Sequence, residues 1–95
     1  MKWMEMIKIQ TASSHVAAKM LTLVEPFKEC EGLLEAKVFR HASVDDCSLC
    51  LCWNTDSPEP LGSSVGFVLC SALKQYGLVD HTVWIEKDTI EEKAS

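Results

Sequence analysis

The chain has few basic side chains and no cluster of them. Lysine and arginine number 9 against 14 aspartates and glutamates, and the net charge is −5. An acidic surface repels phosphate backbones, so this balance argues against nucleic-acid binding. No apolar run approaches the ~20 residues that a membrane-spanning helix needs. We therefore expect neither a nucleic acid nor a membrane as a partner.

The pattern of a secretory leader is also missing. Lys2 is followed by an acid, Glu5, inside what would be the apolar stretch of such a leader. The five cysteines are an odd number, so they cannot all pair within one chain. Reduced thiols are expected in the absence of a leader. We predict a cytoplasmic protein.

The length of 95 residues and the hydrophobic content of 47% fit one folded domain. We place this domain at residues 1–88 and expect a flexible acidic tail at residues 89–95. A chain this short buries a smaller share of its surface than a long one, which makes stabilisation by a partner copy plausible.

Hydrophobic periodicity predicts four strands and two helices. The strands are expected at residues 3–12, 33–41, 47–54 and 78–87, and the helices at residues 14–30 and 61–76. Pro26 cannot donate a helical hydrogen bond, so we expect a kink or break near Val24 and Glu25. Gly32 and Gly77 are suited to follow the two helices.

The order β-α-β-β-α-β predicts a ferredoxin-like α+β fold. Its antiparallel sheet has the spatial order 4-1-3-2, with both helices on one face. We expect the first and third strands to run parallel and both helices to begin at one edge. Ser13-Ser14 and Gly62-Ser63-Ser64 would then be neighbours. We favour helix capping over anion binding for these serines, because neither stretch has the spacing of a phosphate loop.

The second face of this sheet is expected to be apolar. We assign to the helix side the positions Ile7, Ile9, Leu34, Val38, Val83 and Ile85. The open face then holds Met4, Met6, Leu33, Phe39 and Trp84, and either the row Leu49, Leu51 and Trp53 or the cysteine row of the third strand. Charged side chains can shield such a face, but a patch with tryptophans more often marks an interface or a ligand groove. We therefore predict a homodimer.

This layout resembles the dimeric α/β-barrel group and, within it, the antibiotic biosynthesis monooxygenase-like family. The residues that carry the resemblance are the passage Glu31-Gly32-Leu33-Leu34-Glu35-Ala36-Lys37-Val38 and the third strand that ends in Trp53. The resemblance implies a barrel of two sheets that holds a hydrophobic ligand. Some members oxidise aromatic polyketides without a metal or flavin, and others degrade haem.

The chain departs from the haem-degrading members. Those place an asparagine in the first strand and a histidine on the second helix, and neither residue is present here. Arg40 is the only arginine, so the arginine of the polyketide oxidisers has no clear match. The resemblance carries Trp53 over as a pocket wall. We predict no cofactor.

Two functions remain open. One is a small enzyme, monooxygenase-like, that acts on a hydrophobic aromatic substrate. The other is a non-catalytic dimeric binding or sensor module for a small apolar ligand. Either would use a pocket formed by Met6, Phe39, His41, Trp53 and Trp84. His41 is the candidate catalytic base, because histidine titrates near neutral pH, whereas His81 reads as a satisfied core or edge histidine.

The group Cys47-x-x-Cys50-x-Cys52 is the most visible local motif. Cys50 and Cys52 point the same way along a strand while Cys47 points the opposite way, so the three thiols do not converge on one metal. We predict buried structural thiols and no metal site.

Overall fold

The computed structural model of the protein describes residues 1–91. Its elements are β1 (Lys2–Gln10), α1 (Val16–Val24), a 3-10 turn (Glu25–Phe27), β2 (Leu33–Arg40), β3 (Cys47–Asn54), α2 (Ser64–Leu73), a second 3-10 turn (Lys74–Tyr76) and β4 (Leu78–Ile85). The predicted order is confirmed, as is the break of the first helix before Pro26. The proposed domain boundary stays a prediction, and residues 92–95 of the proposed tail lie outside the described residues.

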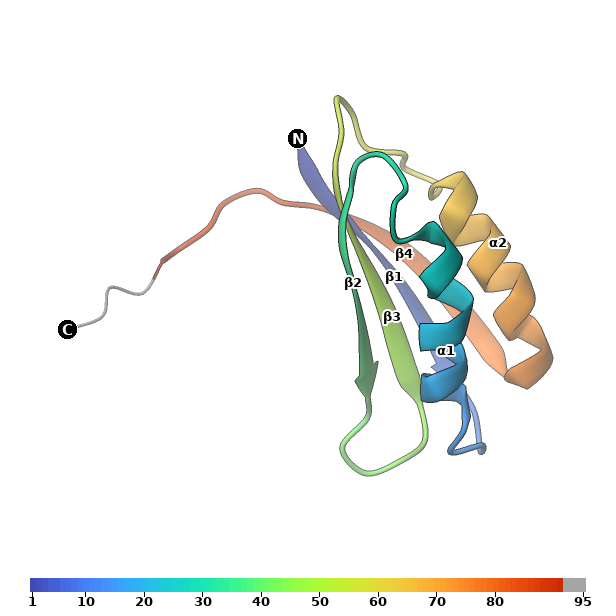
Figure 1. The fold of residues 1–95 in the computed structure, drawn as a ribbon. Coiled ribbons are helices and arrows are strands. Elements are labelled where there is room, and N and C mark those ends of the chain that lie inside the picture. The colour runs from blue at the N-terminus through green and yellow to red at the C-terminus, as the bar shows by residue number, and fades with distance from the viewer. Residues whose placement is uncertain (92–95) are drawn as a thin grey trace.

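The four strands form one sheet in the order β2-β3-β1-β4, and both helices cover the same face of it (Figure 1). Helix α1 packs over β2 and β3, and α2 packs over β1 and β4. This is the predicted ferredoxin-like α+β fold. Within residues 1–91, no helix is long and apolar enough to cross a membrane.

The expected parallel pairing of the first and third strands is wrong. Strand β1 runs antiparallel to β3, with Trp3 opposite Trp53 and Ile9 opposite Cys47. The crossover returns β2 parallel to β1, and the following hairpin reverses the chain again. The helices therefore begin at opposite ends of the sheet (Figure 1), and the two serine pairs do not meet. Ser63 caps α2, since its Oγ accepts a hydrogen bond of 3.0 Å from the backbone N–H of Gly66.

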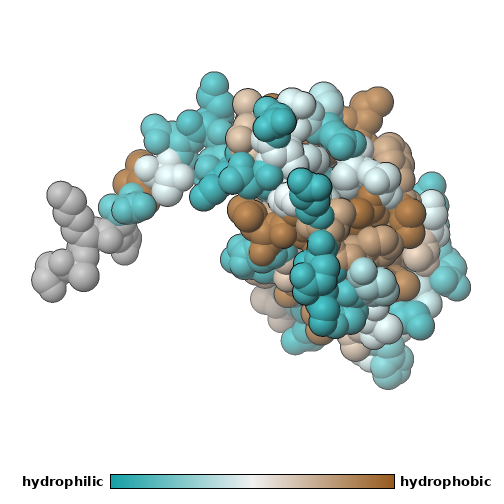
Figure 2. Space-filling view, turned by 45° about the horizontal axis from the view of Figure 1, so that its top comes forward, coloured by the Kyte–Doolittle hydropathy of each residue, from teal (hydrophilic) through white to brown (hydrophobic). Residues whose placement is uncertain are grey.

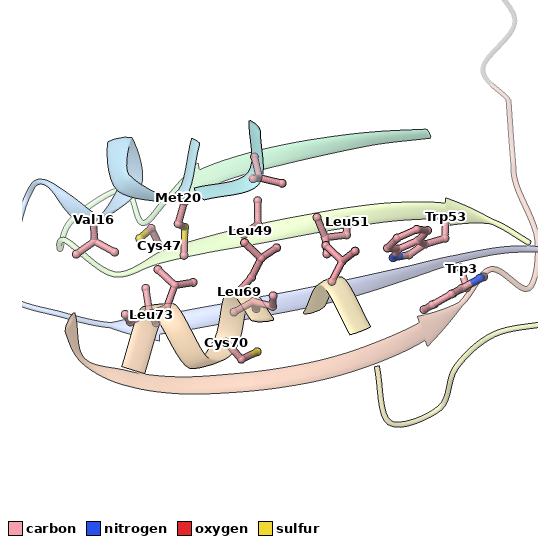
Figure 3. Packing of buried hydrophobic residues seen from close by; sticks show 14 residues of the cluster. Trp3, Val16, Met20, Cys47, Leu49, Leu51, Trp53, Leu69, Cys70 and Leu73 are labelled. Carbon is pink, nitrogen blue, oxygen red and sulfur yellow. The ribbon is translucent and has the colours of Figure 1, made fainter. Parts of the chain in front are cut away.

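The side chains on the helix-facing side of the central strands are buried. Its fully buried members from β1 and β3 include Ile7, Ile9, Leu49 and Leu51. Helix α1 contributes Val16 and Met20, and α2 contributes Leu69 and Leu73 (Figure 3). Apolar side chains at alternating strand positions meet helical positions three or four residues apart, which is the pattern that the sequence predicted.

One assignment on β2 is reversed. Leu34 was expected on the helix side and Leu33 on the open face, but Leu34 is 56% exposed and Leu33 packs against the core. The register between β2 and β3 shifts between Leu33 and Glu35, where a β-bulge inserts one residue. A bulge moves the side chains before it to the other face. Simple alternation therefore fails for these two leucines while it holds for Val38.

The open face carries the cysteine row of β3. Met4 lies opposite Cys52 and Met6 lies opposite Cys50, on the two central strands. Phe39 is 52% exposed and Trp84 is 56% exposed at the edges of the same face. The alternative left open by the sequence is thereby resolved, because Leu49, Leu51 and Trp53 face the helices.

Candidate functional site

A carboxylate lies buried in the core on the helix side of the sheet. Glu5 is the next inward position of β1 after Trp3, and its exposed fraction is 0%. Its Oε1 accepts a hydrogen bond of 2.9 Å from Trp53 Nε1, and its Oε2 lies 2.7 Å from His81 Nε2. A buried charge is tolerated only when it is paired and hydrogen-bonded, and both conditions are met here.

The register of the central strand brings these three side chains together. Glu5 lies opposite Leu51 on β3 and opposite Val83 on β4. Trp53 is two residues beyond Leu51 and His81 is two residues before Val83, so both lie diagonally from Glu5 on the same face. Diagonal neighbours are within reach of long and aromatic side chains. We call Glu5, Trp53 and His81 the core triad.

Two glycines at the start of α2 form the roof of the core triad. A Cβ atom on Gly66 would lie 2.0 Å from Glu5 Oε2, and a Cβ atom on Gly62 would lie 2.2 Å from His81 Cε1. Gly62 also has a φ of +105°, which other residues rarely adopt. The glycines let the first turn of α2 approach the carboxylate.

The second nitrogen of His81 is open. An ionised carboxylate only accepts hydrogen bonds, so a contact with the charged form of Glu5 requires the hydrogen on Nε2 of His81. Within residues 1–91, Nδ1 has no hydrogen-bond partner, and no buried side-chain nitrogen or oxygen lacks one. Nδ1 therefore reaches solvent, which agrees with a side-chain exposure of 15%. A histidine oriented by a buried carboxylate, with its other nitrogen free, is the arrangement of a general base.

Neighbouring side chains contact the rings of Trp53 and His81. Trp53 stacks on Trp3 with 5.6 Å between ring centroids and 16° between planes, at one end of the sheet (Figure 3). Trp3 Nε1 donates a hydrogen bond of 2.8 Å to Thr55 Oγ1. Phe67 of α2 meets the His81 imidazole edge-on, with centroids 5.9 Å apart. The two indoles are locked by stacking and hydrogen bonds, whereas Phe67 is 53% exposed.

The structure divides the pocket residues predicted from sequence between two ends of the sheet. Trp53 and Trp84 both line a groove of about 450 Å³ at the end where β1 begins. Phe39 and His41 line a separate hollow of about 230 Å³ at the opposite end. Met6 lies between them in the middle of the open face and lines neither.

His41 lies just beyond β2 and is exposed. Its Nδ1 accepts a hydrogen bond of 3.0 Å from the backbone N–H of Ser43, and its own backbone N–H donates to Asp46 O at 2.7 Å. These contacts hold the turn between β2 and β3. His81 was predicted to be a satisfied core or edge histidine, but only its Nε2 is paired, with the buried Glu5.

The three cysteines of β3 are divided between the two faces of the sheet. Cys47 faces the helices, and Cys50 and Cys52 face the open side, so the three thiols do not converge. In the described part of the chain, no group of three or more histidine, cysteine, aspartate or glutamate side chains is arranged to hold a metal. Burial raises the pKa of the Cys50 and Cys52 thiols, and it raises the pKa of Cys70 to about 11 with help from the charge of Glu5.

Sequence reasoning missed Glu5, Gly62 and Gly66. One signal was present: Glu5 occupies an inward position of a strand that otherwise reads Trp3, Ile7 and Ile9 on that face. An acid at such a position needs a buried partner. Only the register of β4 identifies His81 as that partner, and no local pattern indicates the glycines.

No protein-family model matches the chain, and no curated protein matches it in sequence. Solved structures do match. Rv0793 from Mycobacterium tuberculosis superposes with a TM-score of 0.70 at 15% identity, over 96% of this chain and 100% of its own. A variant of SnoaB, a cofactor-independent oxygenase from Streptomyces nogalater, gives 0.71 at 13% identity, over 96% and 98%.

A dimeric ferredoxin-like protein from an uncultured marine organism has a TM-score of 0.60 at 9% identity, over 96% of this chain and 93% of its own. The expected likeness to antibiotic biosynthesis monooxygenase-like structures is confirmed at the level of the fold. Each match spans at least 93% of both chains.

Proposed function

We propose that the protein is an enzyme that oxidises a hydrophobic aromatic substrate with dioxygen, without a metal or flavin. The observation that carries this proposal is the core triad, in which the buried Glu5 contacts Trp53 through Oε1 and Nε2 of His81 through Oε2, while Nδ1 of His81 stays free. A similar fold serves the cofactor-independent oxygenase SnoaB, which adds support.

The chemistry needs a substrate carbon with acidic hydrogens, such as the CH₂ group of an anthrone. His81 Nδ1 takes one proton and leaves a carbanion delocalised over the ring system. The carbanion reduces dioxygen and forms a C–O bond, and the imidazolium returns its proton to the peroxide oxygen. Loss of water, which takes the second hydrogen of that carbon, leaves a carbonyl group. One oxygen atom enters the product and the other leaves as water.

In this reaction Glu5 faces the imidazolium that forms when Nδ1 takes a proton. A buried carboxylate 2.7 Å from Nε2 stabilises that cation and keeps the ring in one orientation. Trp53 fixes Oε1 of the carboxylate from the other side. The two strands that flank β1 thus hold Glu5 in place, and β4 presents the base.

The proposal includes a homodimer formed through the open face. That face carries Phe39 and Trp84, which are 52% and 56% exposed, and Met4 and Met6 between them. Exposed apolar patches of this kind mark interfaces. It also includes a cytoplasmic location, because the five cysteines are free and a reducing compartment keeps them so.

The test is oxidation of anthrone to anthraquinone, followed by chromatography and by incorporation of one oxygen atom from ¹⁸O₂. We expect turnover by the wild-type protein and a loss of about 100-fold or more in kcat for His81→Gln. His41→Gln tests the base predicted from sequence. His15→Gln is the matched control, because His15 is exposed and its side chain makes no capping bond.

Retention of full activity by His81→Gln together with loss in His41→Gln would move the site to the other end of the sheet. Binding of anthrone without any product in the wild-type protein would contradict the oxygenase and favour the binding module.

A further inference from the structure

Four sulfur-bearing side chains lie together at the centre of the open face. Met4 lies opposite Cys52 and Met6 lies opposite Cys50, on the two central strands. Side chains directly opposite each other in an antiparallel pair have Cβ atoms about 4.5–5.5 Å apart. Residues two apart on one strand share a face, so the two cysteines are neighbours and so are the two methionines. We call Met4, Met6, Cys50 and Cys52 the thiol–thioether cluster.

The spacing of the two cysteines favours a bridging ion over a disulfide. Residues two apart on a strand have Cα atoms about 6.8 Å apart, which is the upper limit of the usual separation for a disulfide. A metal ion between two thiolates, with bonds of about 2.3 Å each, allows the sulfur atoms to stay further apart than an S–S bond does. Cys50 and Cys52 are both free thiols in the structure.

The kinds of sulfur in the cluster select among metals. Zinc sites in proteins are built from thiolate, imidazole and carboxylate ligands. Within residues 1–91, no group of three or more cysteine, histidine, aspartate or glutamate side chains is arranged to hold a metal. Thioether sulfur is a soft ligand, and a set of thiolates and thioethers suits Cu(I). Methionine has three rotatable side-chain bonds, so its sulfur can move to meet an ion.

The groove of about 450 Å³ gives access to the cluster. Met4 and Cys52 both line this groove, and Cys50 is buried beside them at 4% exposure. Ile85 also lines the groove, and the C-terminal segment that follows it extends away from the body of the molecule (Figure 2). An ion can therefore reach the cluster from solvent in one protomer.

The charges around the cluster also suit a cation. Glu35 and Lys37 of β2 lie opposite Cys52 and Cys50, and they pair with each other at 3.2 Å. Because these two charges offset each other, the thiolates decide the charge of the site. The net charge of −5 on the chain disfavours an anion there.

We propose that the thiol–thioether cluster binds one Cu(I) ion per protomer, with two thiolate and two thioether ligands. Each thiol gives its proton to solvent when the ion binds, as a metal-bound cysteine must. The cluster lies on the face opposite the core triad, so this site goes beyond the proposed oxidation and does not depend on it. Cys47 takes no part, because it faces the helices.

Anaerobic titration with Cu(I), in competition with a chromogenic Cu(I) chelator, tests the site. We expect one Cu(I) per chain in the wild-type protein, with sulfur as the nearest neighbour in its X-ray absorption spectrum. The double variant Cys50→Ser with Cys52→Ser should lose the ion. Met4→Leu and Met6→Leu keep the apolar bulk, and each should weaken binding by about tenfold or more, since even indirect changes around a metal cost that much.

Cys30→Ser and Met20→Leu are the matched controls. Cys30 is a free thiol that precedes β2, and Met20 is buried on the helix side of the sheet. We expect wild-type affinity for Cu(I) in both, with circular dichroism showing that every variant is folded.

The possible results decide both the site and its ligands. Absence of Cu(I) binding in the wild-type protein, or unchanged binding in the double cysteine variant, would overturn the site. Equal losses of affinity in Cys30→Ser and in the double variant would overturn it as well. Wild-type affinity in both Met4→Leu and Met6→Leu would overturn the four-sulfur ligand set. Displacement of bound Cu(I) by an equal concentration of Zn²⁺ would overturn the choice of ion.

Discussion

The two faces of the same central strands have opposite characters. On the helix side, β1 and β3 place Ile7 opposite Leu49 with both side chains at 0% exposure, and Glu5 is sealed among them. On the other side, Met6 lies opposite Cys50, with charged and aromatic side chains at the edges. One face is completed by its own helices. The other exposes Phe39 and Trp84, through which we propose a homodimer.

This contrast shows how burial changes the energetic importance of a charged pair. On the open face, Glu35 pairs with Lys37 at 3.2 Å while both side chains stay about half exposed, at 51% and 53%. On the helix side, Glu5 is fully buried and accepts two hydrogen bonds from rings held by neighbouring strands. Water weakens the first pair, whereas the low-dielectric core makes the second pair indispensable once it is present.

The largest expected effect comes from breaking the buried pair. Glu5→Ala leaves the Trp53 N–H and His81 without their acceptor, and we expect a loss of about 3–5 kcal/mol in the free energy of unfolding. Urea denaturation followed by tryptophan fluorescence measures it. Glu35→Ala is the matched control on the open face, where we expect less than about 1 kcal/mol. Equal losses in the two variants would contradict the contrast between the faces.

A second comparison uses adjacent residues of β1. Ile7→Ala opens a cavity in the closed core and should cost about 2–5 kcal/mol. Met6→Ala removes a side chain from the open face, so we expect a smaller loss within one protomer but a weaker homodimer. Urea denaturation gives the first quantity and light scattering at micromolar concentration gives the second. A wild-type protein of monomeric mass would refute the dimer, and a dimer of unchanged strength in Met6→Ala would exclude Met6 from its interface.

The smallest expected effect concerns pH. The pKa of Cys70 is raised from 9.0 to about 11 in the folded protein, mainly by burial and also by Glu5. Between these two values the folded state holds a proton that the unfolded chain releases, so its free energy of unfolding falls as the pH rises from 9 to 11. We expect a shallower decline in Cys70→Ala. Identical slopes in wild type and Cys70→Ala, measured by urea denaturation across that range, would show that Cys70 does not contribute.

Most of the fold could be predicted from residue patterns. Strand β3 was predicted with its observed bounds, and the break of α1 before Pro26 follows from the missing amide hydrogen of proline. The errors have physical causes. The bulge between Leu33 and Glu35 is not encoded in alternation. The direction of β1 relative to β3 follows from three reversals of the chain, one at each end of α1 and one at the β2–β3 hairpin.

The candidate site was harder to predict from the sequence than the fold was. Sequence analysis selects residues by chemical type, and it therefore selected His41 as the candidate base and considered the cysteine motif around Cys50. The residues that matter in the core triad are an acid in a strand and a histidine 76 positions later. Their meeting requires β1 to be central and β4 to pair with it in one register, which is a property of the sheet.

By itself, the sequence determined the order of the elements, the apolar character of both faces and the acidic surface, because periodicity and composition act locally along the chain. The tertiary structure decided which face each row of β3 takes, which end of the sheet each predicted pocket residue occupies, and that Glu5, His81 and Trp53 are in contact. Those outcomes depend on strand register, where a shift of one residue moves every side chain to the other face.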